Sequence, residues 1–225
     1  MTTDLTWLAT FTTVAILLCY ELALGVAQRR APARLARTAH ASLRQEWFEA
    51  VSAQKGSEIL AVQTLRNSLM SATMTASTAA LGLMATATLA APSLHSSFGE
   101  VTGVANFTPR LALELVLLAL LLASLVSSAM AVRYFNHAGF IGAIPVDSEA
   151  RRRWKSAGSA YVRRAGVLYS WGLRHLILVA PVLASILHPA AGPVAAMVVV
   201  AVLFGFDRIS TATIPAPRTS AAAQS

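Results

Sequence analysis

Long apolar runs, separated by shorter polar and charged stretches, dominate the chain. Four of them, at residues 5–27, 69–91, 111–132 and 167–187, have the length of about 20 residues that a helix needs to cross a hydrocarbon core roughly 30 Å thick. A fifth run, at 190–206, is shorter. Because backbone amides must find partners within the segment in hydrocarbon, the pattern predicts an all-α, multi-pass transmembrane helix bundle. We expect one integral membrane domain over residues 1–208 and a disordered tail over 209–225.

The number of spans depends on the segment between the fourth and fifth runs. Residues 188–193 read HPAAGP, and two prolines with a glycine in six residues do not continue a straight helix. A tight hairpin here predicts five spans. The alternative is a single long fourth span with a kink, which gives four spans and places the end of the chain on the opposite side.

Composition excludes a soluble globular domain, since 56% of residues are hydrophobic and only 12% are charged, against about a quarter charged in soluble proteins. With five spans, Arg110 is the only one of the 18 Lys and Arg residues on one face of the membrane. This asymmetry predicts a plasma membrane protein of the bacterial inner membrane type, with its N-terminus outside and its C-terminus cytoplasmic. The single cysteine, Cys19, lies in an apolar run, so no intrachain disulfide and no thiol metal site is expected.

Two charged stretches predict basic amphipathic helices on the cytoplasmic surface. One begins at a cap formed by Asp147 or Ser148 and repeats apolar or small residues at helical spacing: Trp154, Gly158, Tyr161, Ala165 and Leu168. A weaker one carries Leu43, Trp47 and Val51. We expect their bases to contact anionic lipid headgroups, because nothing in the chain resembles a nucleic-acid-binding module.

Polar residues at the inner ends of the spans predict a layer at one depth. Ionisable groups are costly in a bilayer and face a partner or water there. The candidate layer contains Glu21, Gln63, Arg66, Asn67, Arg133, Asn136, His137, Arg174 and His175. It is either structural, with Glu21 paired to Arg66 or Arg174, or a binding site for an anion or a lipid headgroup. His137 and His175 have no Cys or Asp at ligand spacing, so we predict no metal and no cofactor.

The second span is rich in small hydroxyl residues. Ser71, Thr75, Thr78 and Gly82 fall on one helical seam, which allows close helix packing or, alternatively, the lining of a hydrated pore. The third span offers Ser124 and Ser128 as a further pair of small residues, and its Glu114 is placed either to snorkel to the membrane surface or to meet Arg110.

Three segments resemble the integral membrane family catalogued as domain of unknown function 599. They are EILAVQTLRNSLM at 58–70 with its continuation to Thr78, RYFNHAGF at 133–140, and GLR at 172–174 running to Pro181. The resemblance covers residues 20–207 and implies a multi-pass membrane protein. It names no substrate and no catalytic residues, but it includes Gln63, Arg66, Asn67, Asn136, His137 and Arg174 among its motif positions.

No catalytic motif is present: the chain has no GxSxG, GxxxxGK[ST] or HExxH. The sequence therefore favours a non-enzymatic scaffold or accessory protein that forms a homo-oligomer or packs against a membrane partner. A small channel or transporter for an anion or polar solute is the alternative. A lipid-headgroup enzyme is a third possibility, disfavoured because no nucleophile is paired with a base.

Overall fold

A computed structural model describes residues 2–30, 36–98 and 107–208, all of which belong to α-helices or their connections. The expected disordered tail at 209–225 lies outside the described residues. The helices are α1 (Thr2–Arg30), α2 (Ala36–Val51), α3 (Glu58–Phe98), α4 (Pro109–Ala143), α5 (Glu149–Leu187) and α6 (Ala191–Arg208).

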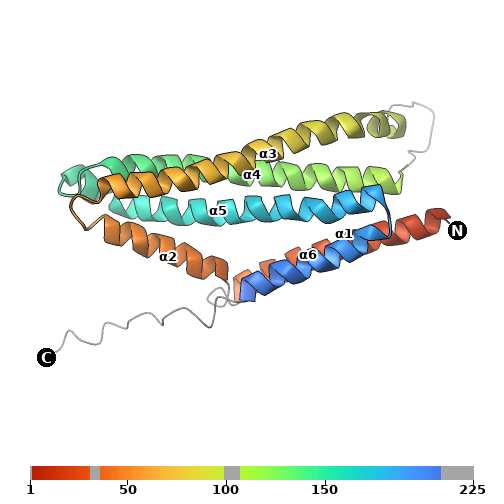
Figure 1. The fold of residues 1–225 in the computed structure, drawn as a ribbon, viewed down its shortest axis with the longest axis horizontal. Coiled ribbons are helices and arrows are strands. Elements are labelled where there is room, and N and C mark those ends of the chain that lie inside the picture. Colours follow the sequence, from red (N-terminus) through yellow and green to blue (C-terminus); the bar gives the residue numbers. More distant parts are fainter. Residues whose placement is uncertain (1, 31–35, 99–106, 209–225) are drawn as a thin grey trace.

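The helix α5 is the centre of the bundle and contacts the other five helices. Figure 1 shows α3, α4 and α5 side by side along the long axis, with α1 and α6 against α5 at one end and α2 against α5 at the other. We call these the α6 end (α1 and α6 with residues 69–98, 109–132 and 167–187) and the α2 end (α2 with residues 58–68, 133–143 and 149–166).

The expected turn between the fourth and fifth apolar runs is confirmed. Helix α5 ends at Leu187, the His188 amide donates to the Ala184 carbonyl, and α6 begins at Ala191 and runs back along α5 (Figure 1). Four helices are long and apolar enough to cross a membrane, and α6 is a shorter apolar helix. The all-α membrane bundle is thus present, and a continuous kinked fourth span is not.

Helices α3, α4 and α5 are longer than a membrane crossing requires. They contain 41, 35 and 39 residues, which is about 50 to 60 Å each at 1.5 Å per residue, against a hydrocarbon core of about 30 Å. The basic stretch expected as a separate surface helix is the first part of α5, capped by Ser148, whose side chain accepts from the Arg151 amide. The second expected surface helix is α2, which packs on α5.

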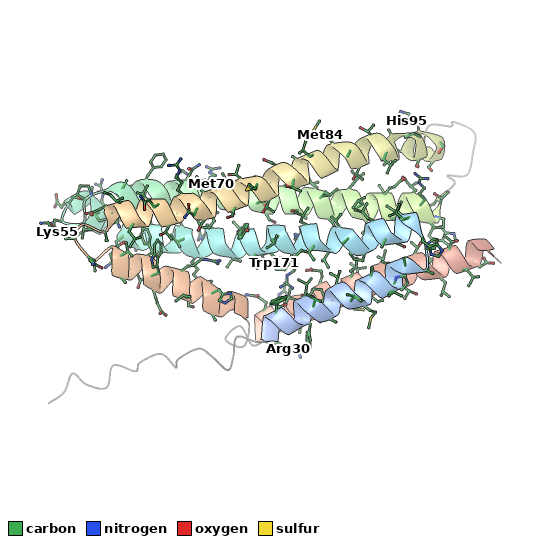
Figure 2. The ribbon with its side chains drawn as sticks, in the orientation of Figure 1. Arg30, Lys55, Met70, Met84, His95 and Trp171 are labelled. Carbon is green, nitrogen blue, oxygen red and sulfur yellow. The ribbon has the colours of Figure 1, made fainter. Side chains whose placement is uncertain are left out.

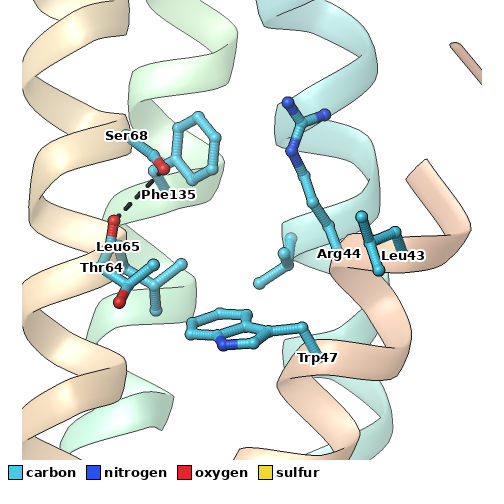
Figure 3. Close-up of a pocket in the computed structure, with 8 residues that line it drawn as sticks. Leu43, Arg44, Trp47, Thr64, Leu65, Ser68 and Phe135 are labelled. Carbon is cyan, nitrogen blue, oxygen red and sulfur yellow. Dashed lines mark hydrogen bonds between the residues drawn. The ribbon is translucent and has the colours of Figure 1, made fainter. Parts of the chain in front are cut away.

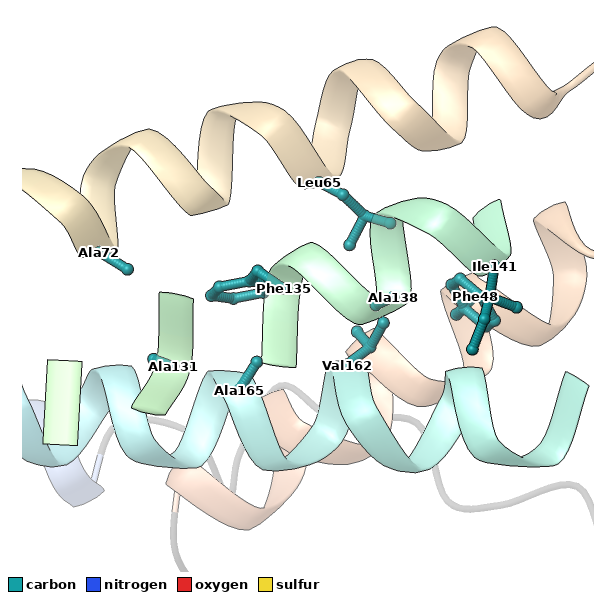
Figure 4. Packing of buried hydrophobic residues seen from close by; sticks show 9 residues of the cluster. All are labelled: Phe48, Leu65, Ala72, Ala131, Phe135, Ala138, Ile141, Val162 and Ala165. Atoms are coloured by element: carbon teal, nitrogen blue, oxygen red, sulfur yellow. The ribbon is translucent and has the colours of Figure 1, made fainter. Parts of the chain in front are cut away.

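Large side chains fill the core of the α2 end. Phe48 of α2 is fully buried and packs with Phe135 of α4 and Val162 of α5, and Leu65 of α3 joins the same cluster (Figure 4). Gly158 makes room for Phe48, because a Cβ at this glycine would overlap the Phe48 ring. These contacts make the start of α5 part of a packed four-helix core.

Small side chains bring the helices of the α6 end together. The face of α3 toward α4 is lined by Ala72, Thr75, Ala79, Thr86 and Ala90, all buried. Gly172 of α5 lies against Ser128 of α4, and the Ser124 hydroxyl donates to the Gly172 carbonyl over 2.7 Å. Close approach of this kind is how helices associate in lipid, where hydrophobic burial does not drive packing.

Candidate functional site

A buried ionic cluster of Tyr20, Arg174 and Asp207 joins three helices at the α6 end; we call it the Arg174 cluster. Arg174 Nη2 lies 2.8 Å from Asp207 Oδ1 and 3.0 Å from Oδ2, and Nη1 donates to the Tyr20 hydroxyl. That hydroxyl donates to Asp207 Oδ2 over 3.1 Å. The Arg174 and Asp207 side chains are only 7% and 15% exposed. The cluster therefore ties α5 to α6 and α1 through charge-assisted hydrogen bonds.

The hairpin between α5 and α6 explains why these two charges meet. Arg174 lies thirteen residues before the end of α5, and Asp207 lies sixteen residues after the start of α6. Because the two helices are antiparallel, similar distances from the turn place both residues at a similar depth. Asp207 was not among the sequence candidates, although its similar distance from the turn is a signal that could have found it.

Two further members of the predicted layer lie beside the cluster. Glu21 follows Tyr20 on α1 and is half-buried. The His175 ring stacks on Trp171 of the same helix, with 5.6 Å between ring centroids. The structure thus brings Glu21, Arg174 and His175 to the α6 end, where the carboxylate that contacts Arg174 belongs to Asp207.

The remaining members of the predicted layer lie at a different level. They are all exposed on α3 and α4 at the α2 end: Gln63, Arg66, Asn67, Arg133, Asn136 and His137. The His137 ring lies 5.8 Å from that of Tyr161, and Tyr161 is thirteen residues from Arg174 on α5, or about 20 Å along the axis. The single layer is therefore divided into two levels, because the helices continue beyond the ends of their apolar runs.

The predicted seam of the second span also has two parts. Thr75 is buried, and a Cβ at Gly82 would lie 3.0 Å from Cδ2 of Leu121 on α4, so these positions face the bundle. Ser71 and Thr78 are exposed, and their hydroxyls donate to the carbonyls of Asn67 and Met74 four residues earlier. One part of the seam is an internal packing surface, and the other lies on the outside of the molecule.

The exposed part of the seam continues along α3 at heptad spacing. This surface, which we call the outer α3 face, consists of Asn67, Ser71, Met74, Thr78, Leu81, Ala85 and Thr88, all exposed. It lies on the helix at the edge of the bundle, and the nearby Met84 points away from the other helices in Figure 2. Its hydroxyls at 71, 78 and 88 already donate within the helix.

Of two other buried charges, sequence reasoning predicted the partner of Glu114 and did not predict the burial of Arg151. Glu114 is fully buried and accepts from Arg110 Nε over 2.9 Å, the pair that the spacing predicted. Arg151, expected on a lipid-facing surface, is fully buried: its guanidinium donates to the carbonyls of Ile141 and Ile144 and to the Ser52 hydroxyl, and it lies over the Phe48 ring. It joins α2, α4 and α5 at the α2 end.

Groups of metal-ligating side chains are not assembled among residues 2–30, 36–98 and 107–208. No group of three or more His, Cys, Asp or Glu side chains there could hold a metal ion. The clusters that the described residues form are suited to joining helices.

These helices define a multi-pass membrane protein with an all-α bundle. The sequence model of a family described as "Protein of unknown function, DUF599" matches residues 8–212. The chain belongs to this family, as the three motifs indicated. Neither a curated protein nor a solved structure matches the chain.

Proposed function

We propose that the protein is a non-enzymatic membrane scaffold that self-associates through the outer α3 face. The observation that carries the proposal is the regular spacing of that face. Small residues recur every seventh position, at Ser71, Thr78 and Ala85, with Met74 and Leu81 between them. A seven-residue repeat keeps one seam of a helix against a partner in a left-handed pair, and small residues let the two backbones approach.

A second copy of the chain is the partner that this surface fits best. A two-fold arrangement places each outer α3 face against its own copy, so that every small residue meets a complementary position. Burying the hydroxyls of Ser71 and Thr78 between two helices costs little, because each already donates to a carbonyl of its own helix. Methionine adapts its shape to such a surface, which suits Met74 at the centre of the seam.

The placement of polar groups supports a scaffold over a channel within one subunit. The hydroxyls of Ser71 and Thr78 face outward, so they do not line a path through the bundle. The Arg174 side chain is closed off by Asp207 and Tyr20. Between α4 and α5, Gly172 lies against Ser128 and the backbone of Ser124, so the two helices pack closely at this point.

The proposed orientation places the α2 end in the cytoplasm and the N-terminus outside. Exposed bases gather at the α2 end, among them Arg66, Arg133, Arg152, Arg163 and Arg164. An excess of Lys and Arg marks the cytoplasmic side of bacterial inner membrane proteins.

Subunit counting in bilayers tests the self-association. The double variant Ser71→Leu with Thr78→Leu keeps the face apolar but prevents close approach, so we expect the wild-type oligomer to become monomeric. The control is Thr73→Leu with Ala87→Leu, two exposed positions on another side of α3, which should leave association unchanged. The measurement is single-molecule photobleaching in liposomes at decreasing protein-to-lipid ratio. A wild-type monomer at all ratios, or equal effects of both double variants, contradicts the proposal.

A small transporter is the second candidate, because the Arg174 cluster places ionisable side chains within apolar helices. Ionisable groups within membrane spans are most often functional, because an unneeded buried charge is costly. In proteoliposomes, this candidate requires wild-type flux of chloride or phosphate that Arg174→Met with Asp207→Leu abolishes. Absence of flux in the wild type eliminates it for these anions.

A further inference from the structure

A cavity of about 330 Å³ lies at the α2 end, where α2 meets α3, α4 and α5. Its lining combines an arginine and two hydroxyls with apolar and aromatic side chains: Leu43, Arg44, Trp47, Thr64, Leu65, Ser68, Phe135 and Val162 (Figure 3). The volume is within the usual range for small-molecule sites, about 300 to 1,000 Å³. We call it the Arg44 cavity.

Arg44 gives the cavity a positive charge that no carboxylate in the described part of the chain neutralises by an ion pair. Its side chain is half-buried and lies across Gly166 of α5, where any Cβ would overlap the guanidinium group. Burial lowers the pKa of Arg44 from its ordinary value, but an arginine remains protonated at neutral pH. A partly desolvated cation without a counter-ion is stabilised by an anionic ligand.

The other walls indicate an amphipathic ligand. Thr64 and Ser68 of α3 stand across the cavity from Arg44, and Trp47 lies between α2 and α3 (Figure 3). The Ser68 hydroxyl lines the cavity and donates to the Thr64 carbonyl over 3.2 Å. Leu65, Phe135 and Val162 provide an apolar surface, so the site offers a cation beside hydrocarbon.

The position of the cavity along the bundle indicates where this ligand comes from. Ser68 directly precedes the apolar run 69–91, Phe135 follows the run 111–132, and Gly166 directly precedes the run 167–187. The cavity therefore lies at the edge of the hydrocarbon core, at the depth of lipid headgroups, where tryptophan is also enriched.

We propose that the Arg44 cavity binds a phosphate group, supplied by an anionic phospholipid, with Arg44 as the charged ligand. The planar guanidinium matches two phosphate oxygens at once. The glycerol and upper acyl carbons lie against Leu65 and Phe135. This site is separate from the outer α3 face, so it stands or falls independently of self-association.

Lipid retention by the full-length protein tests the site. The protein is placed in nanodiscs of equal parts phosphatidylglycerol and phosphatidylcholine, extracted in mild detergent, and the lipid that stays bound is measured by native mass spectrometry. We expect preferential retention of phosphatidylglycerol. Arg44→Gln should lower that retention about tenfold, the loss expected for charge-assisted hydrogen bonds, whereas Arg152→Gln, an exposed base on α5, should leave it within about twofold.

A second variant and a second probe complete the experiment. Ser68→Phe fills the cavity without removing Arg44 and should reduce retention in the same way, which separates loss of the site from misfolding at Arg44. Inorganic phosphate, titrated into lipid-free micelles, distinguishes the source: an Arg44-dependent change in tryptophan fluorescence without phosphatidylglycerol preference assigns the site to free phosphate. Equal retention by wild type and Arg44→Gln, with no phosphate response, overturns the proposal.

Discussion

The two ends of the bundle differ in their cores and in their exposed surfaces, although each end buries a charged side chain, Arg151 at the α2 end and Arg174 at the α6 end. At the α2 end, Phe48 and Phe135 are buried while Arg152 and Arg163 are exposed. At the α6 end the charged Glu114 and Arg174 are buried, and large apolar side chains are exposed: Leu8, Phe11, Leu18, Leu22, Leu122, Val126, Leu183, Met197, Val198 and Val202. The α2 end exposes many bases together with a few apolar side chains such as Ile59 and Phe140, whereas the surface of the α6 end is mostly apolar, as it is in helices that face lipid.

The interactions that hold the two ends together differ accordingly. Water drives the burial of Phe48 and its neighbours at the α2 end. Lipid supplies no such force at the α6 end, so its helices depend on close packing of small residues and on polar contacts such as the Arg174 cluster. The α1 and α6 helices, which carry exposed apolar surface on most of their length, are fixed to α5 through this cluster.

The largest expected effect comes from breaking the Arg174 cluster. Asp207→Ala removes the carboxylate from the buried Arg174 guanidinium and leaves the hydrogen bond to the Tyr20 hydroxyl, and removal of one partner from a buried ion pair costs about 3 to 5 kcal/mol. Replacing both partners, Arg174→Met with Asp207→Leu, should restore much of the stability. The measurement is thermal unfolding in nanodiscs followed by tryptophan fluorescence. If the single and double variants unfold alike, the ion pair does not fix α6 to α5.

A smaller effect is expected from crowding the core of the α2 end. Gly158→Ala forces a methyl group into the Phe48 ring, and overpacking of a tight core costs about 1 to 3 kcal/mol. Gly139→Ala in α4 is the matched control, because nothing lies within 4 Å of its Cβ and alanine favours a helix by about 1 kcal/mol over glycine. In the same assay, Gly158→Ala should lower the unfolding temperature and Gly139→Ala should raise it. A tolerated Gly158→Ala means that α2 is not packed firmly on α5.

The fold could be predicted from the sequence more fully than the site. The apolar runs and the prolines of residues 188–193 are local signals that indicate where helices run and where one ends. Hydrocarbon requires continuous helices, and the two prolines and one glycine of residues 188–193 coincide with the end of α5, whereas the single Pro92 and Pro181 lie inside α3 and α5. The length of α5 does not follow from these signals. An amphipathic stretch such as 149–166 has the same periodicity whether its apolar face meets lipid or another helix, and only the contact of Gly158 with Phe48 decides between them.

The partners of the charged residues depend on three-dimensional packing that spacing alone does not give. Arg151 and Arg152 are neighbours in one basic stretch, but one is fully buried and the other exposed. Thr75 and Thr78 likewise belong to one seam predicted from the sequence, but Thr75 is buried and Thr78 is exposed. A small rotation of a helix about its axis decides whether such a residue is buried or exposed, and the neighbouring helices set that rotation.

The smallest effect is expected at the surface of the α2 end. Lys55 Nζ lies 2.8 Å from Asp147 Oδ2, but the two side chains are 82% and 67% exposed, so water and salt screen the pair. The hydrogen bond and the charge of Asp147 raise the pKa of Lys55 above its ordinary value of 10.5. Its contribution is therefore present at neutral pH and lost only as the pH rises through that raised pKa.

We expect Lys55→Met to leave the unfolding temperature at pH 7 unchanged. Arg151→Met should lower it, because the substitution removes a fully buried guanidinium and leaves its acceptors, such as the Ser52 hydroxyl, without that donor. Both variants remove one positive charge from the same end of the bundle, so net charge does not explain a difference between them. Equal shifts would mean that the α2 end is stabilised by its overall charge pattern, and the contrast between an apolar, tightly packed interior and a solvated exterior would not hold there.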